Sequence, residues 1–323
     1  MRYLIGTDEA GYGPNLGPLV VSATLWQVPR NVRAGDLYQR LANVISTRPG
    51  RAGRNPAKRV AMADSKILYQ PGKGLRHLER GLWVAMSLVD QDPDSWSEIW
   101  HALAPESVAE LQTIPWYADY DSPVPLDVDP AEIQPLAAAV RKELAAQDIW
   151  LIDILSRAVF PEQFNRLVKH YGSKGSALSH LTLELVSRAM HLLDGDAISI
   201  VCDKHGGRNR YRPLLAEHFP DHLIEIRGEG RKQSVYRFGP PHRRVEICFQ
   251  AKAESHLPTA LASMASKYLR ELAMRAINDY WCDRVAGLQP TAGYPQDAKR
   301  FKKAIAGVQS ELGIDEQVLW RVK

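Results

Sequence analysis

The acidic residues near the start of the chain are the first that could do chemistry. Asp8 and Glu9 follow a short apolar run and precede a glycine-rich turn. Neighbouring side chains in a strand point to opposite faces, so the two carboxylates can converge only if the turn, with its Gly11 and Gly13, rotates one of them. Converging carboxylates can hold two Mg²⁺ ions about 4 Å apart, which activate water against a phosphodiester. The alternative, a plain surface dipeptide, stays open.

A third carboxylate, Asp203, stands at the end of the apolar run 197–202. Open α/β sheets hold their ligands at the carboxyl ends of strands, which favours a functional role for this residue. A turn or helix-capping role is the alternative, because Asp is common after strands and Gly206 and Gly207 follow closely.

Histidine and cysteine do not form a recognisable metal signature. His205, His242 and His256 have no metal-ligand spacing with another His or Cys, and we expect them on the polar surface. Oxygen-only ligands favour Mg²⁺ or Mn²⁺ over Zn²⁺. The three cysteines are odd in number and widely spaced, which fits neither a disulfide framework nor a zinc site and agrees with a reduced cytosol.

Length and composition are those of an ordinary globular protein. The 323 residues are 45% hydrophobic and 24% charged, enough for a substantial core. The N-terminus lacks a signal-peptide pattern, and we find no run of roughly 18 apolar residues, so we expect a cytoplasmic protein with no membrane contact. A net charge of +4 leaves the partner open, and the distribution of charge says more.

Alternating apolar and turn patterns predict an α/β chain in which a mixed sheet is flanked by helices. We expect a single domain over 1–323 that ends in a helical region at 257–323. The predicted strands are 2–7, 18–28, 149–160 and a buried strand at 197–203, and the predicted helices are 161–170, 176–193, 257–280 and 295–311.

Three segments stand out by charge. Residues 91–147 hold eleven acidic and two basic side chains and predict an acidic, helical insertion. Residues 204–244 hold ten basic and four acidic side chains with aromatic residues between them, and predict a basic, strand-rich insertion that faces phosphate. Residues 48–59 carry five basic side chains and predict a mobile loop. For both basic segments, a merely solvated surface is the alternative.

Beyond these patterns, the stretch TDEAGYGPNLGPLVVSA at residues 7–23 resembles the opening of type 2 ribonucleases H, the HII and HIII families. Further resemblances follow along the chain. They are Asp64-Ser65-Lys66, Lys252-Ala253-Glu254-Ser255, the helix 262–271 that ends in Arg270-Glu271 where the family has Arg-Asp, and Gly293-Tyr294-Pro295.

The resemblance implies a ribonuclease H-like fold and a two-metal site that uses Mg²⁺ or Mn²⁺. By position it implies catalytic metal ligands at Asp8, Glu9, Asp203 and Glu254, a supporting carboxylate at Glu271, and substrate-binding positions at Gly11, Tyr12, Gly13, Ser65, Lys66 and Tyr294. The implied partner is nucleic acid; no protein partner is indicated.

The chain departs from the family pattern at several positions. Tyr12 stands where ribonucleases HII have Arg and many ribonucleases HIII have Lys. The backbone of this turn can still contact a ribose 2′-hydroxyl, but the positive charge of the Arg or Lys side chain is absent. Asp203 and Glu254 are further apart than usual, and extra strands are expected between them. Lys204 replaces the common Gly, and its ammonium would compete with a metal.

The activity that the resemblance implies is hydrolysis of the RNA strand of RNA/DNA hybrids, or cutting at ribonucleotides embedded in DNA. Two alternatives remain. One is a nucleic-acid-binding protein of the same fold without efficient catalysis, motivated by Tyr12, Lys204 and the insertions. The other is a structure-specific nuclease that acts on DNA alone.

Overall fold

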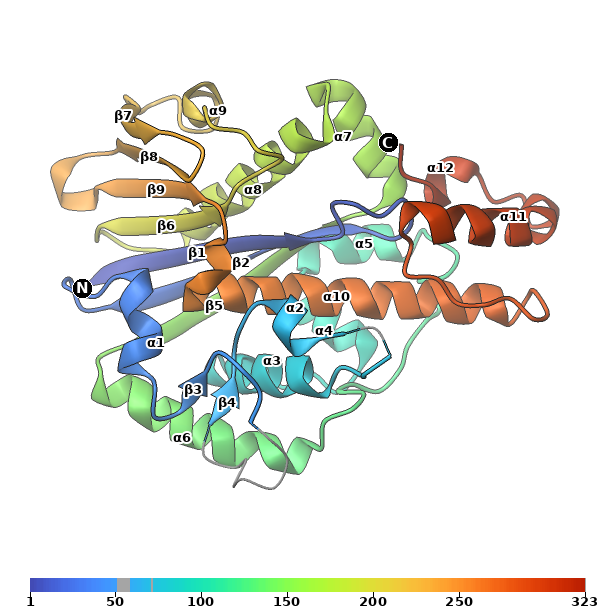
Figure 1. Ribbon diagram of the computed structural model, residues 1–323, viewed down its shortest axis with the longest axis horizontal. Helices are drawn as coiled ribbons and strands as arrows, with labels where there is room; N and C mark the ends of the chain where they lie inside the picture. The colour runs from blue at the N-terminus through green and yellow to red at the C-terminus, as the bar shows by residue number, and fades with distance from the viewer. Residues whose placement is uncertain (51–58, 71, 323) are drawn as a thin grey trace.

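A seven-stranded mixed sheet organises the computed structural model, which describes residues 1–50, 59–70 and 72–322. The strand order is β5-β2-β1-β6-β9-β8-β7; β1, β6 and β9 run parallel and the other neighbours pair antiparallel (Figure 1). The strands are β1 Arg2–Ala10, β2 Leu19–Val28, β5 Trp150–Val159, β6 Ile198–Asp203, β7 Glu225–Glu229, β8 Gln233–Phe238 and β9 Val245–Gln250. A small parallel ladder joins β3 Ile45–Ser46 to β4 Val60–Ala61.

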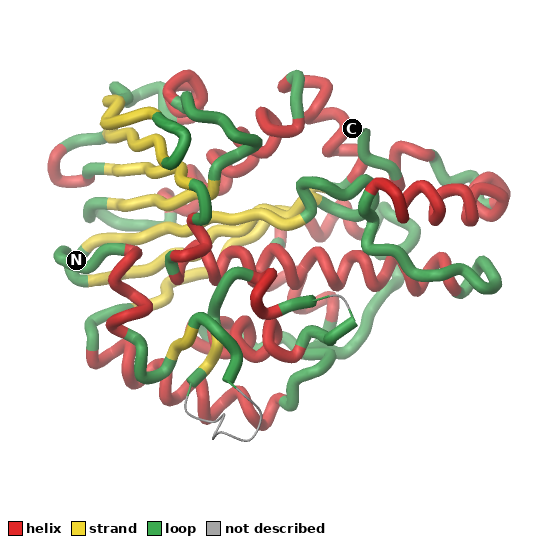
Figure 2. Tube along the Cα trace, in the orientation of Figure 1, coloured by secondary structure: helices red, strands yellow, loops and turns green. Residues whose placement is uncertain are grey.

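Helices flank this sheet, which confirms the predicted fold class (Figure 2). The longer ones are α3 Arg76–Leu88, α4 Trp96–Leu103, α6 Ile133–Ala146, α7 Pro161–Tyr171, α8 Lys174–His191, α9 Arg212–His218, α10 Leu257–Cys282 and α11 Pro295–Glu311. The short ones are α1 Leu37–Arg40, α2 Ser65–Leu68, α5 Val108–Leu111 and α12 Glu316–Leu319. Most of the predicted mobile loop at 48–59 lies outside the described residues.

Helix α10 packs directly against β1 and β2. A Cβ on Gly6 would lie 2.3 Å from Pro258 C and from Thr259 N, so only glycine allows this approach. Thr24 Oγ1 donates a hydrogen bond of 2.7 Å to Pro258 O, which fixes the start of the helix on the sheet. The small residues at 260, 262, 263, 265 and 266 of α10 are buried.

The acidic segment 91–147 is helical, as predicted, and its apolar side chains are part of the core. It contains α4, α5 and α6, and its tryptophans Trp96, Trp100 and Trp116 are buried. Its loop at 126–128 is held by a buried carboxylate of α3, Glu79, which accepts hydrogen bonds from all three backbone N–H groups. The acidic side chains therefore coat an ordered, packed unit.

Strand β6 forms where the buried strand at 197–203 was predicted, with one face fully buried and the other half-buried. Ile198, Ile200 and Cys202 pack in the apolar cluster beneath α8 and α9, whereas Ser199 and Val201 alternate with them and are half-buried. The cause is the position of α10, which begins beside β6 and then runs over β1 and β2. In Figure 1, where the described chain is drawn, β8 and β9 face the viewer with no helix in front of them.

Candidate active site

Two neighbouring parallel strands bring the first acids together. Thr7 of β1 pairs with Cys202 of β6, so Asp8 and Asp203 are the next residues along two adjacent strands at the same end of the sheet. Parallel neighbours lie about 4.8 Å apart, which puts the two carboxylates within direct electrostatic reach. Strand β1 continues through Ala10, so no turn separates Asp8 from Glu9, and the glycine turn begins only at Gly11.

The fourth acid arrives from the end of β9. That strand pairs in parallel with β6, and a short 3₁₀ turn, Ala253–Ser255, follows it and carries Glu254. Ala253 N–H donates to Asp203 Oδ1 over 3.4 Å, and Lys252 takes a left-handed conformation with φ of 62°. These two features turn the chain so that Glu254 lies beside Asp203.

Burial raises the pKa of all four carboxylates, and for Asp8, Glu9 and Glu254 the charge of a neighbouring acid adds to this effect. Burial, with the neighbouring charge of Glu9, raises the pKa of Asp8 well above its usual range. Burial and the charge of Asp203 raise the pKa of Glu9 to about 7. The pKa values of Asp203 and Glu254 are also raised, first by burial. Groups in this state are stabilised by a nearby cation.

The donor chemistry of this cluster fits a hard divalent cation. All four side chains offer carboxylate oxygens, and Glu254 Oε2 is buried without a hydrogen-bond partner among the described residues. Within the described ranges, however, no group of three or more His, Cys, Asp or Glu side chains is arranged so that it could hold a metal ion. A bound Mg²⁺ or Mn²⁺ therefore requires these side chains to turn toward a common point.

Helix α2 borders the acids on one side. The Asp64 side chain accepts a hydrogen bond from Lys66 N–H and caps the helix. The Lys66 side chain is 83% exposed, and its Nζ lies 4.0 Å from Glu254 Oε1. The Ser65 hydroxyl lies 3.0 Å from that of Ser263 on α10.

The sequence analysis did not single out Ser263 as part of the site. Its side chain lowers the pKa of the Asp8 carboxyl, against the larger effect of burial, while its hydroxyl donates to Ser65 Oγ. Only the run of small residues at 262–266 hinted that this face of the helix lies close to the sheet. The structure therefore adds Ser263 to the residues that surround Asp8.

The glycine turn after β1 is held from beneath by a buried arginine, Arg321. Its guanidinium donates to the carbonyls of Gly11, Tyr12 and Pro14. The Cζ atom of this guanidinium also lies 4.4 Å from the centre of the Phe164 ring. Arg321 is completely buried. Its sequence context is indistinguishable from that of a surface arginine, so it was not predicted.

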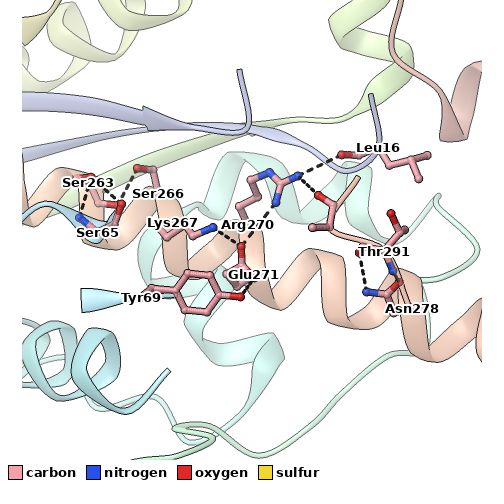
Figure 3. A network of polar contacts seen from close by, with 11 residues as sticks. Leu16, Ser65, Tyr69, Ser263, Ser266, Lys267, Arg270, Glu271, Asn278 and Thr291 are labelled. Atoms are coloured by element: carbon pink, nitrogen blue, oxygen red, sulfur yellow. Dashed lines mark hydrogen bonds and ion pairs between the residues drawn. The ribbon is translucent and has the colours of Figure 1, made fainter. Parts of the chain in front are cut away.

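Glu271 takes part in a polar network on α10 that Figure 3 shows. It forms ion pairs with Lys267 and Arg270 and accepts a 2.8 Å hydrogen bond from Tyr69, the residue that ends α2. Arg270 in turn donates to Leu16 O, in the segment that follows the glycine turn. Glu271 thus links α2 and the glycine segment to α10, and all of these partners lie outside the four acids.

The two tyrosines predicted near the substrate have different surroundings. Tyr294 is 57% exposed, and a Cβ on Gly13 would lie 3.9 Å from its Cε1. The Tyr12 hydroxyl instead faces the start of α8 and the turn after β6, where a Cβ on Gly206 would lie 3.3 Å from it. Tyr294 is therefore available to a ligand, whereas Tyr12 is packed against the protein.

The basic residue after Asp203 does not point at the acids. Lys204 Nζ donates to Arg208 O, Asn209 Oδ1 and Gly230 O at 2.7–3.1 Å, so it closes its own loop. The expectation that His205 lies on the polar surface was wrong. Its ring is buried and hydrogen-bonded to Ser179 Oγ, and burial lowers its pKa to about 3.

Comparison with known proteins gives matches among solved structures only; no family model and no curated protein matches the chain. Similar structures include ribonuclease HII from Archaeoglobus fulgidus in a complex with PCNA, at 15% identity and a TM-score of 0.43, which covers 99% of this chain and 94% of the other. Ribonuclease H2 from Pyrococcus horikoshii matches at 13% identity and a TM-score of 0.42, and the match covers 98% of this chain and 92% of the other. Bst-RNase HIII in complex with Mn²⁺ matches at 15% identity and a TM-score of 0.43, and the match covers 99% of this chain and 66% of the other.

These are enzymes of the families that residues 7–23 resemble. At such low identities and TM-scores, the likeness does not assign an activity, a metal or a partner to this chain. The proposal that follows rests on the side chains of the chain itself. In the described residues, no helix is long and apolar enough to cross a membrane.

Proposed function

We propose that this chain is a metal-dependent endonuclease that cuts the RNA strand of RNA/DNA hybrids or cuts at ribonucleotides embedded in DNA. The observation that carries the proposal is that Asp8, Glu9, Asp203 and Glu254 lie at the same end of neighbouring strands, where burial raises the pKa of all four carboxylates. A protein that only bound phosphate would gain nothing from acids at this place, because their charge repels the ligand unless a cation neutralises it.

In this proposal the four acids hold Mg²⁺ or Mn²⁺. When bound, the ions activate water and stabilise the departing oxygen, leaving a 5′-phosphate and a 3′-hydroxyl. Ser263 connects the acids to α2, because it lies beside Asp8 and donates to Ser65 Oγ. Lys66 offers an exposed ammonium to the phosphate at the edge of the cluster.

Recognition of ribose is assigned to the turn at 11–13 and to Tyr294. Arg321 binds three carbonyls of this turn, which leaves its backbone fixed next to the acids. A rigid backbone can read a 2′-hydroxyl, the group that distinguishes RNA from DNA. The exposed ring of Tyr294 lies beside Gly13 and would stack on the sugar.

Cleavage of three end-labelled duplexes with Mg²⁺ or Mn²⁺ tests this function. The duplexes are an RNA/DNA hybrid, a DNA duplex with one ribonucleotide, and an all-DNA duplex of the same sequence. We expect cuts only in strands that contain ribose, with 5′-phosphate ends. Cutting of all three would support a DNA nuclease instead, and binding without any cut would support a nucleic-acid-binding protein.

A further inference from the structure

A basic groove lies on the half-buried face of β6, β9 and β8, beside the acids. It is a cavity of about 630 Å³ between these strands, the start of β1 and the turn Ala34–Asp36. Leu4 and Val201 contribute apolar surface to it. Its cationic side chains are Arg2, Arg33, Arg237 and Arg244, and its acids are Asp36 and Glu246.

The positive charge of the groove is only partly neutralised within the protein. Arg237 pairs with Glu246 over 2.7 Å. Arg33 and Arg244 form no ion pair within the described residues. Arg2 donates to Ser199 Oγ, but its Nε is buried without a hydrogen-bond partner there; burial lowers its pKa, against the charge of Glu246, which raises it. An anion in the groove would give Arg33, Arg244 and Arg2 Nε a partner.

The groove is separated from the candidate active site by the start of α10, because Pro258 and Thr259 lie against Gly6 of β1, between Leu4 of the groove and Asp8. Gln250 lines one end of it and is the register partner of Asp203 in the parallel pair of β9 and β6. His256, which also lines it, accepts a 2.8 Å hydrogen bond from Gln250 and lies two residues after Glu254. The other end is reached at Arg2 and Ile198, the first residues of β1 and β6.

The length of the groove matches a short stretch of nucleic acid. From Glu246 to Gln250, the lining residues of β9, four residue steps of about 3.3 Å give ~13 Å along the strand. One strand of a duplex has a phosphate every ~3.4 Å of helix axis, so this distance corresponds to about four phosphates. Apolar surface between arginines suits sugars and phosphates, which present both kinds of surface.

We propose that this groove binds the phosphodiester backbone of the nucleic-acid substrate over about four nucleotides, on the far side of the start of α10 from the cut. The inference rests on the proposed function, because it takes the nucleic acid that the acids would cut as the occupant. It assigns a role to part of the basic segment 204–244, since Arg237 and Arg244 belong to the groove or its border.

The double variant Arg33→Gln/Arg244→Gln tests the groove, with Lys142→Gln/Lys169→Gln as the control. The two control lysines are exposed and lie on α6 and α7, so the pair removes the same charge elsewhere. Binding of a fluorescent hybrid duplex is measured by anisotropy at several salt concentrations, with the whole protein in the Asp203→Asn background so that no strand is cut.

We expect the groove variant to lose roughly tenfold or more in affinity at about 0.1 M salt, and to reduce the slope of log affinity against log salt by about 2 relative to the control. Duplexes that end at the cut, and so cannot reach the groove, should not distinguish variant from control. Equal slopes for the two variants on the long duplex would overturn the proposal.

The outcome for the groove is separable from that for the nuclease. Weaker binding with a reduced slope, in a protein whose Asp203-containing form cuts nothing, would support the groove as a nucleic-acid site and contradict the nuclease function. Ribose-specific cutting by a protein whose groove variant binds like the control would support the nuclease function and contradict the groove as a nucleic-acid site.

Discussion

The buried carboxylate of Glu79 provides a sharp test of how the structure is held together. It is completely buried on α3 and accepts hydrogen bonds from Leu126 N (2.6 Å), Asp127 N (2.7 Å) and Val128 N (3.0 Å). A fourth bond of 2.8 Å comes from the Tyr268 hydroxyl on α10. One side chain thus joins α3, α10 and the loop of the acidic insertion.

We expect Glu79→Gln to lower the free energy of unfolding by about 3 kcal/mol. Glutamine has nearly the same shape, so packing is retained, but its single carbonyl oxygen can accept from about two of the four donors. At least two donors then face the amide NH₂, and each buried donor without an acceptor costs ~1–3 kcal/mol. The range is therefore about 2–6 kcal/mol, and relaxation favours the lower half.

Urea unfolding followed by tryptophan fluorescence measures the change, with Glu132→Gln as the control. Glu132 pairs with Arg76 at the surface, and exposed pairs contribute at most ~1 kcal/mol. Hydrogen exchange at residues 126–128 should accelerate in Glu79→Gln and stay unchanged in the control. A loss of less than about 1 kcal/mol for Glu79→Gln, with unchanged exchange, would refute this reasoning.

Three further predictions follow from other contacts. Gly6→Ala should cost more than about 3 kcal/mol in urea unfolding, because its Cβ would meet the backbone of α10 at 2.3 Å; a loss below 1 kcal/mol would contradict that contact. The ring nitrogens of His180 and His218 lie 3.0 Å apart, and burial lowers the pKa of both residues, so the unfolded chain binds protons more readily than the folded one. The free energy of unfolding should therefore be fully present above about pH 6.5 and decrease below it. Thermal melts at several pH values should show a less steep decrease for His180→Gln. Arg321→Gln should slow cutting at ribonucleotides tenfold or more under single-turnover conditions, because the 11–14 turn loses its anchor; unchanged rates in a folded variant would contradict this.

Much of the fold could be predicted because its local signals are strong. The apolar strands around the glycine turn predicted the hairpin of β1 and β2. The helix at 295–311 was predicted with its bounds, since Pro295 begins it where its missing N–H costs nothing. The predicted long helix at 257–280 begins at the predicted residue and ends slightly later, at Cys282.

The rest depends on long-range packing. The one-sided burial of β6 follows from where α10 lies, which periodicity over six residues cannot indicate. His205 is buried because its ring packs against Tyr211 and Phe249, and Ser179 on α8 provides a hydrogen-bond partner for Nδ1. Arg321 reaches a turn more than 300 residues earlier in the chain. No local pattern could have predicted these contacts.

The approach of Glu254 to Asp203 has the same origin. It requires β9 to pair in parallel with β6, although β7 and β8 lie between these two strands in the sequence. The sequence alone gave no register for that pair, and the position of Glu254 was expected only from the resemblance at 252–255. The placement of all four acids together is therefore a result of the sheet order, and their role as metal ligands remains a proposal.

The most direct test of the central proposal is the single-turnover rate of cutting at one embedded ribonucleotide with saturating Mn²⁺, for wild type, Asp203→Asn and Asp119→Asn. Asp119 is exposed in the acidic insertion, so it is a matched control. We predict that wild type and Asp119→Asn cut at the same rate and that Asp203→Asn is slower by at least 10³-fold while still binding the duplex. Equal rates for wild type and Asp203→Asn would contradict the proposal that these carboxylates form the catalytic centre.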